Sequence, residues 1–214
     1  FWTGLSLKKL GDYSAAIAML KPAAEKYKDS PIAERIVYQW ADSEQLQGHF
    51  DAARTLFLDV VTRWPQGSLA DESLHAASLA ALNGGKVPDA EGLVARFDKE
   101  YAGSKLRLRN EVLKGRIQLA KNDAASAAKH FEKVVAESEI ESTKQQARYY
   151  LAGAAQRLGQ HARVIEVSEP LVAEVAKSAN GGEFASIHVL RGASALSLGK
   201  AAAKAKQVEP AKQF

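Results

Sequence analysis

The chain has 214 residues, of which 46% are apolar and 25% are charged, with 15 Gly, 6 Pro and no Cys. This composition excludes a collagen-like, low-complexity or disordered chain and leaves one or two folded domains. The lack of Cys excludes disulfide frameworks, thiol catalysis and Cys-ligated metal sites. The net charge of +4 gives little support to nucleic-acid or anionic-membrane binding. We expect no membrane span, because no apolar stretch approaches the ~18 residues that one requires.

A short sequence motif recurs along the chain. In it, a Gly or Asn at a turn is followed by an apolar residue and then by small residues. The first four intervals between successive turns are 37 residues each, and the last is 40. Equal intervals of this length are typical of a repeat protein in which each repeat is one supersecondary unit. The turn residues are Gly11, Gly48, Gly85, Asn122, Gly159 and Gly199.

Between the turns, apolar residues recur at every third or fourth position, which predicts helices, and no stretch alternates as a strand would. Each unit is therefore expected to hold a first helix before its turn and a second helix after it. The predicted first helices cover residues 1–10, 31–47, 69–83, 105–121, 142–158 and 184–198. The predicted second helices cover residues 12–27, 49–64, 87–101, 123–138, 160–178 and 200–208.

These helix pairs predict an all-α solenoid, a single domain over residues 1–214 with about 37 residues per helix hairpin. The units are placed at about residues 1–28, 29–65, 66–102, 103–139, 140–182 and, as a partial unit, 183–214.

Small residues stand at fixed distances from the turns, where they would let two helix backbones approach closely. Seven residues before the turns lie Gly4, Ala41, Ser78, Gly115, Ala152 and Gly192. Five residues after the turns lie Ala16, Ala53, Ala90, Ala127 and Val164. Larger apolar residues nine positions after the turns are expected to fill the space between units, namely Leu20, Phe57, Val94 and Phe131.

This arrangement resembles the tetratricopeptide repeat family, with a small residue in the first helix, a Gly-x-aromatic turn, Ala in the second helix and a closing Pro. The best-matching unit carries Ala41, Gly48, Phe50, Ala53, Phe57 and Pro65 at the expected offsets. The resemblance covers nearly the whole chain. It implies a right-handed α–α superhelical solenoid.

A second resemblance concerns the phrase from Trp64 to Glu72. It is similar to the Tyr-Pro-x-Ser-x-x-Ala phrase of bacterial envelope repeat proteins, namely the Tol-Pal system periplasmic protein and the outer-membrane assembly lipoprotein. The resemblance implies a bacterial periplasm or cell envelope, with the cytoplasm as the alternative. Because the sequence begins at Phe1 rather than at Met, we expect a piece of a longer polypeptide whose signal peptide or anchor lies outside it.

Catalytic chemistry has no recognisable motif in this sequence. No phosphate loop, His-Glu-x-x-His, Gly-x-Ser-x-Gly or Gly-x-Gly-x-x-Gly occurs. The five His residues come one per region and do not form a ligand cluster. We therefore expect no enzyme, no cofactor, no metal and no small-molecule substrate.

The resemblance implies instead that the first helices form a concave wall that binds a peptide or protein segment. In the family, wall residues lie thirteen, ten, six, three and two positions before each turn. Arg109 and Arg116 are two helical turns apart, so they could hold an acidic peptide by bidentate pairing, whereas the alternative is a solvated basic face without a partner. The candidate partner-binding residues are Arg35, Tyr38, Asp42, Gln45, Glu72, His75, Asn83, Arg109, Arg116, Gln146, Tyr149 and Arg157.

Three functions remain, in order of preference. The first is a non-enzymatic protein–protein interaction scaffold in a bacterial cell-envelope assembly. The second is a self-assembly or structural module of a larger protein, because incomplete end units could stack on other copies. The third is a nucleic-acid-binding helical repeat, which only the mild basicity favours.

Overall fold

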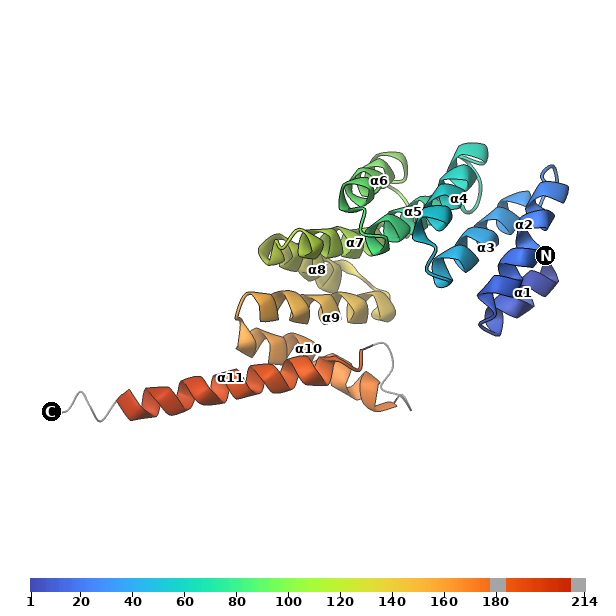
Figure 1. Cartoon of the computed structure of the whole chain (residues 1–214). Coiled ribbons are helices and arrows are strands. Elements are labelled where there is room, and N and C mark those ends of the chain that lie inside the picture. The colour runs from blue at the N-terminus through green and yellow to red at the C-terminus, as the bar shows by residue number, and fades with distance from the viewer. Residues whose placement is uncertain (178–183, 209–214) are drawn as a thin grey trace. The chain divides into compact units, whose positions relative to one another are not determined.

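The computed structural model describes residues 1–177 and 184–208, which form eleven α-helices joined by turns, without a strand among them (Figure 1). The predicted all-α fold is confirmed. The helices are α1 (Trp2–Lys9), α2 (Tyr13–Lys26), α3 (Ala33–Leu46), α4 (Phe50–Arg63), α5 (Ala70–Asn83), α6 (Val87–Glu100), α7 (Arg107–Ala120), α8 (Ala124–Glu137), α9 (Glu141–Arg157), α10 (His161–Lys177) and α11 (Ile187–Val208). The first ten begin and end within two residues of their predicted bounds.

Five of the predicted turns share one backbone form. Their turn residues have a positive φ, between 62° and 88°, which Gly and Asn adopt at little cost. In each turn the next residue donates its N–H to the carbonyl five residues earlier, as His49 does to Glu44 at 2.8 Å. This hydrogen bond caps the C-terminal end of the first helix, after which the chain reverses direction and continues as the second helix. The turn residues are Gly11, Gly48, Gly85, Asn122 and Gly159.

The sixth predicted turn is wrong. Helix α11 continues through Gly199 to Val208, so the predicted helices at 184–198 and 200–208 are one helix. A single Gly costs a helix only about 1 kcal/mol, and the Lys and Ala residues that follow Gly199 are strong helix formers. Within the described residues no second helix packs back on α11 to hold a turn there. The predicted boundary at 182–183 lies outside the described residues.

The chain divides into two compact units, residues 1–113 (unit 1) and residues 114–214 (unit 2), and the boundary falls within α7. In unit 1, consecutive helices pack on each other, from the α1–α2 pair to the α5–α6 pair. Leu20 of α2 is fully buried with Ile36 of α3, and Phe57 of α4 packs with Ala77 of α5. Gly4 of α1 allows Leu20 to pack closely on it, because an ideal Cβ there would lie 2.7 Å from Leu20 Cγ.

In unit 2, helices α8 to α11 pack in the same sequential way. Phe131 of α8 is fully buried and lies against Gly115 of α7, where an ideal Cβ would come within 2.4 Å of the ring. Ala152, Leu171 and Ile187 join α9, α10 and α11 in one apolar cluster. The small and large residues thus meet in each unit as their spacing predicts. No described helix combines the length and the apolar character that crossing a membrane requires.

Candidate partner-binding face

Polar side chains from successive first helices meet on one face of unit 1. Lys8 of α1 donates to Asp42 of α3 at 2.7 Å. Tyr38 of α3 hydrogen-bonds to Glu72 of α5. The members of each pair are 34 residues apart, three fewer than one repeat, so each contact links positions of neighbouring repeats that differ by about one helical turn. We define the first-helix face of unit 1 by six residues: Lys8, Arg35, Tyr38, Asp42, Glu72 and Arg109.

The Tyr38 hydroxyl is a partly enclosed polar group of this face. Burial raises the pKa of Tyr38 well above its usual value, and the negative charges of Glu72 and Asp42 raise it further, whereas Arg109 lowers it. The hydroxyl therefore stays protonated and donates to Glu72. Its ring packs edge-on against Phe57, with 5.4 Å between the ring centroids. Tyr38 therefore contacts both the polar first-helix face, through its hydroxyl, and the apolar core beneath it, through its ring.

Two cations of the first-helix face have no carboxylate partner in the described part of the chain. The side chains of Arg35 and Arg109 are exposed, and neither forms an ion pair with any described residue. Arg35 lies over the ring of Phe1, with 5.8 Å from its guanidinium carbon to the ring centroid. Lys8, by contrast, is neutralised by Asp42. The face therefore offers guanidinium groups that can still accept an anionic partner.

The other predicted residues of unit 1 have different surroundings. Gln45 is half-buried, and its side-chain oxygen is enclosed without a hydrogen-bond partner. His75 is half-buried with its ring edge-on to the core residue Phe97, at 6.3 Å between centroids. Asn83 is exposed at the end of α5. His75 thus contributes to packing, while Asn83 is accessible to solvent.

In unit 2, Arg116 lies over the ring of Tyr150, with 5.3 Å to its centroid. Arg157 of α9 donates to the backbone carbonyl of Leu119 at 2.8 Å. The hydroxyls of Tyr149 and Ser186 are 2.7 Å apart. Gln146 is half-buried on the same helix as Tyr149. Because Arg109 belongs to unit 1 and Arg116 to unit 2, their predicted joint action on an acidic peptide stays a prediction.

Three contributors to these faces were missed by the sequence analysis. Lys8 stands three residues before Gly11, so the wall offsets would have found it had they been applied to the first turn. Phe1 stands ten residues before Gly11, so the same offsets would have found it as well. Tyr150 stacks on Phe131 with 5.6 Å between centroids, and it lies one residue after the wall position of Tyr149.

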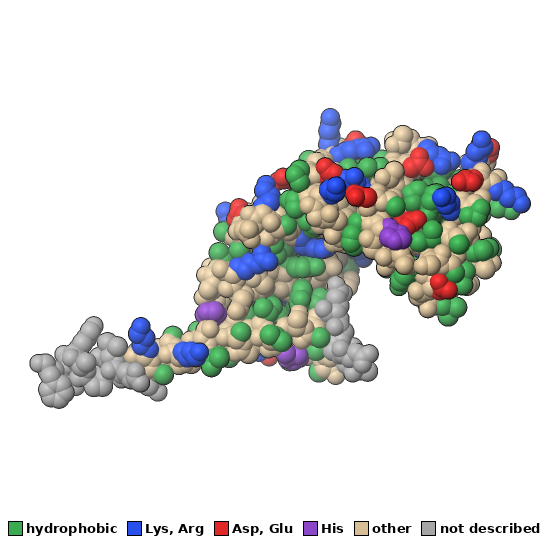
Figure 2. Space-filling model, in the orientation of Figure 1, with side chains coloured by type: hydrophobic (Ala, Val, Ile, Leu, Met, Phe, Trp, Pro, Cys, Tyr) green, Lys and Arg blue, Asp and Glu red, His purple; other side chains and the backbone are tan. Residues whose placement is uncertain are grey.

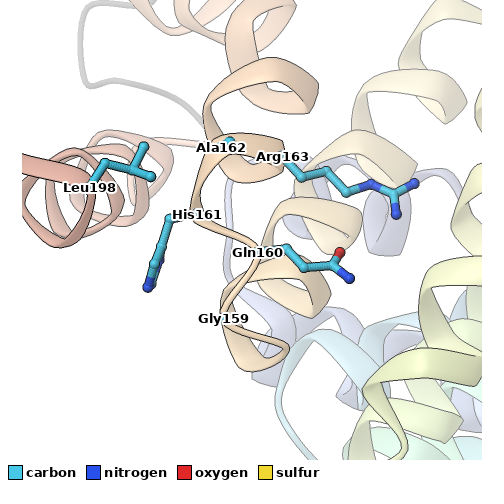
Figure 3. Close-up of a pocket in the computed structure, with 6 residues that line it drawn as sticks. All are labelled: Gly159, Gln160, His161, Ala162, Arg163 and Leu198. Carbon is cyan, nitrogen blue, oxygen red and sulfur yellow. The ribbon is translucent and has the colours of Figure 1, made fainter. Parts of the chain in front are cut away.

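Two cavities are lined by residues that do not belong to the first-helix face of unit 1. One, of about 450 Å³, lies between the start of α10 and α11 (Figure 3). Figure 3 shows Leu198 directed toward α10, while Gln160 and Arg163 point away from α11, and Arg163 is paired with Glu132. The other, of about 390 Å³, lies between α4 and α6 beside the Arg54–Asp89 ion pair. Neither has the converging polar groups of a catalytic site, and no described cluster of His, Asp and Glu could hold a metal ion.

The helical arrangement of this chain is also found in known proteins. Residues 1–30 match the sequence model of the tetratricopeptide repeat family. Solved tetratricopeptide repeat structures share the fold over most of the chain. The family model thus covers the first repeat, and the rest of the chain shares the fold of these structures. The sequence matches none of the curated proteins with which it was compared.

Three solved structures illustrate this fold. The tetratricopeptide-like repeats of a putative kinesin light chain from Podospora anserina are 19% identical, with a TM-score of 0.65 over 82% of this chain and 92% of that one. A tetratricopeptide repeat protein from Parabacteroides merdae is 15% identical, with a TM-score of 0.65 over 97% and 75% of the two chains. The Rap conjugation gene regulator of plasmid pLS20, solved in complex with the Phr* peptide, is 13% identical, with a TM-score of 0.60 over 81% and 53%.

Proposed function

We propose that this tetratricopeptide repeat chain is a non-enzymatic scaffold that binds a peptide or protein segment along the first-helix face of unit 1. The observation that carries the proposal is the pair of exposed guanidinium groups, of Arg35 and Arg109, without a carboxylate partner among the described residues. Guanidinium groups pair with carboxylates by two parallel hydrogen bonds, so this face favours a segment with acidic side chains.

The rest of the face supports this role because it is already ordered. The Lys8–Asp42 ion pair and the Tyr38–Glu72 hydrogen bond hold neighbouring first helices in place without a ligand. A segment that binds to such a face does not have to order these side chains, so less of its interaction energy is lost to entropy. The Rap regulator, which was solved with a peptide bound, supports the capacity of this type of fold to hold one.

The test is to select peptides from a displayed random library against the protein and to measure their affinities by isothermal titration. The double variant Arg35→Glu/Arg109→Glu should weaken the selected peptides by at least about tenfold, because each charge-assisted hydrogen bond contributes about 1.5–3 kcal/mol. The matched control is Lys21→Glu/Lys99→Glu, which makes the same change of charge on exposed second-helix positions. Peptides that bind the face variant as well as the wild type, or that lose affinity equally with the control, would refute the proposed face.

The proposed setting is a bacterial cell envelope, and the cytoplasm is the alternative. The proposal rests on the resemblance of the phrase between Trp64 and Glu72 to envelope repeat proteins. Fractionation of bacteria that produce the full-length natural protein tests it directly. Recovery in the cytoplasmic fraction alone would contradict the envelope setting while leaving the binding proposal intact.

A further inference from the structure

Helix α11 packs on the neighbouring helices α9 and α10 of unit 2 through one of its faces. Ile187 and Ser194 are fully buried on that face. Ser194 donates to the side-chain oxygen of Gln156 in α9 at 2.6 Å, and Arg191 donates to the carbonyl of Ile165 in α10 at 2.9 Å. This face of α11 is thus engaged with α9 and α10.

The opposite face of α11 carries Gly192, the sixth in the series of small residues that stand seven positions before a turn. The five earlier members are all buried. In two of them a bulky side chain of the following second helix fills the space, with Leu20 over Gly4 and Phe131 over Gly115. An ideal Cβ at Gly192 would meet nothing within 4 Å. The notch that a second helix fills elsewhere is therefore open here among the described residues.

Exposed apolar side chains border this notch. Val189 is 72% exposed and Leu196 is 60% exposed. They precede and follow Gly192 by three and four residues, so all three lie on one stripe of the helix. We call Val189, Gly192 and Leu196 the open face of α11. Its shape, a gap between two apolar side chains, is complementary to a bulky apolar side chain on an approaching helix.

The charge of α11 has one sign. Residues 187–208 contain no Asp or Glu, and Lys200 and Lys204 are exposed beyond the open face. Figure 2 shows hydrophobic and basic side chains on the part of α11 that extends past α9 and α10. A second copy of α11 would bring no carboxylate to these lysines. Charge complementarity therefore favours a different, acidic helix over self-association.

We propose that the open face of α11 binds an amphipathic helix of a partner protein that places a Leu or Phe over Gly192 and acidic residues beside Lys200 and Lys204. The partner helix would take the place that a second helix takes in the earlier repeats. If it runs antiparallel to α11, as second helices run to first helices, its N-terminal end lies over the two lysines. Acidic residues are also favoured at that end by the helix dipole.

A synthetic helix tests the proposal directly. The probe is a fluorescein-labelled peptide with the sequence of residues 123–137, which carries Phe131 at the required position, preceded by two added glutamates. Fluorescence polarisation should show saturable binding to the wild-type protein. Replacing Phe131 of the peptide by Ala, or the two glutamates by lysines, should each weaken binding by about tenfold.

The matched protein variants are Gly192→Leu and Gly153→Leu. Both glycines lie inside helices of unit 2 and have no atom within 4 Å of an ideal Cβ, so circular dichroism should show that both variants stay folded. Gly192→Leu fills the notch and should weaken the peptide about tenfold or more, whereas Gly153→Leu should leave its affinity unchanged. Binding that Gly192→Leu does not alter, or no saturable binding at all, would overturn the proposal. Sedimentation showing a wild-type dimer that Gly192→Leu dissociates would assign the open face to a second copy and would also overturn it.

Discussion

The contact between Gly115 and Phe131 gives the sharpest test of how these helices pack. The change Gly115→Ala adds one methyl group to α7. An ideal Cβ at this position would lie 2.4 Å and 2.6 Å from two carbon atoms of the Phe131 ring. Carbon atoms in contact are normally about 3.5–4.0 Å apart, so the overlap exceeds about 1 Å. Phe131 is fully buried, and the ring of Tyr150 stacks on it with 5.6 Å between the centroids.

The expected loss follows from two opposing contributions. Overpacking a well-packed core costs about 1–3 kcal/mol, and an overlap of this size against an enclosed ring belongs at the upper end. Replacing Gly by Ala in a helix interior raises the free energy of unfolding by about 1 kcal/mol. Gly115→Ala should therefore lower the free energy of unfolding by about 2 kcal/mol, which for a chain of this length is a fall of about 4–8 °C in Tm.

Thermal and urea unfolding followed by circular dichroism measures this loss. The matched control is Gly153→Ala in α9, where an ideal Cβ meets nothing within 4 Å, so this variant should gain up to about 1 kcal/mol. Combining Gly115→Ala with Phe131→Leu should make the added methyl less harmful, because the two substitutions share one contact. If Gly115→Ala stabilises the chain as Gly153→Ala does, the close approach of α7 and α8 is refuted.

Two further predictions concern the core and a helix cap. Ala53→Leu, at a fully buried helix crossing, should cost about 1–3 kcal/mol in urea unfolding, and an equal effect of Ala52→Leu, at the exposed neighbouring position, would contradict the assigned crossing. Asp123 accepts a hydrogen bond from the backbone N–H of Ser126 at 2.9 Å, and the hydrogen bonds from Ser126 lower the pKa of Asp123. Because a lowered folded-state pKa contributes stability above the unfolded-state pKa and loses it as pH falls, the wild type should lose this contribution below about pH 4. Asp123→Asn keeps a capping side chain without a titrating group, so unfolding measured from neutral to acidic pH should show a smaller acid loss, and an identical acid loss in both proteins would contradict this role.

Most of the fold could be predicted from the sequence, because the sequence patterns that determine it are local. A Gly or Asn that takes a positive φ ends a helix within one turn of chain, and five such residues recur at equal spacing. The small residues that precede the turns identify the buried stripe of each first helix before any tertiary contact is known. For this reason the first ten helices could be predicted within two residues at each end.

The candidate site could be predicted from the sequence only in part. The repeat offsets placed Tyr38, Asp42 and Glu72 among the wall residues, and side-chain contacts in the folded chain link each of them to a neighbouring first helix. The same offsets placed His75 there, although its ring packs on Phe97. Offsets give the helix position of a residue, but the partner of a side chain depends on a helix about one repeat away in the sequence.

The sequence by itself determined where ten helices begin and end and which of their residues are small enough to be crossed by another helix. Only the tertiary structure decided that Gly199 continues a helix and that Gly192 lies open, although Gly192 stands seven residues before Gly199, as the small residues do before the earlier turns. The physical reason is that one glycine shifts the helix equilibrium by only about 1 kcal/mol, whereas a hairpin forms when the returning helix buries enough apolar surface. At α11 no described helix supplies that burial, so the same residue types that fold a hairpin elsewhere leave a long helix with an open face.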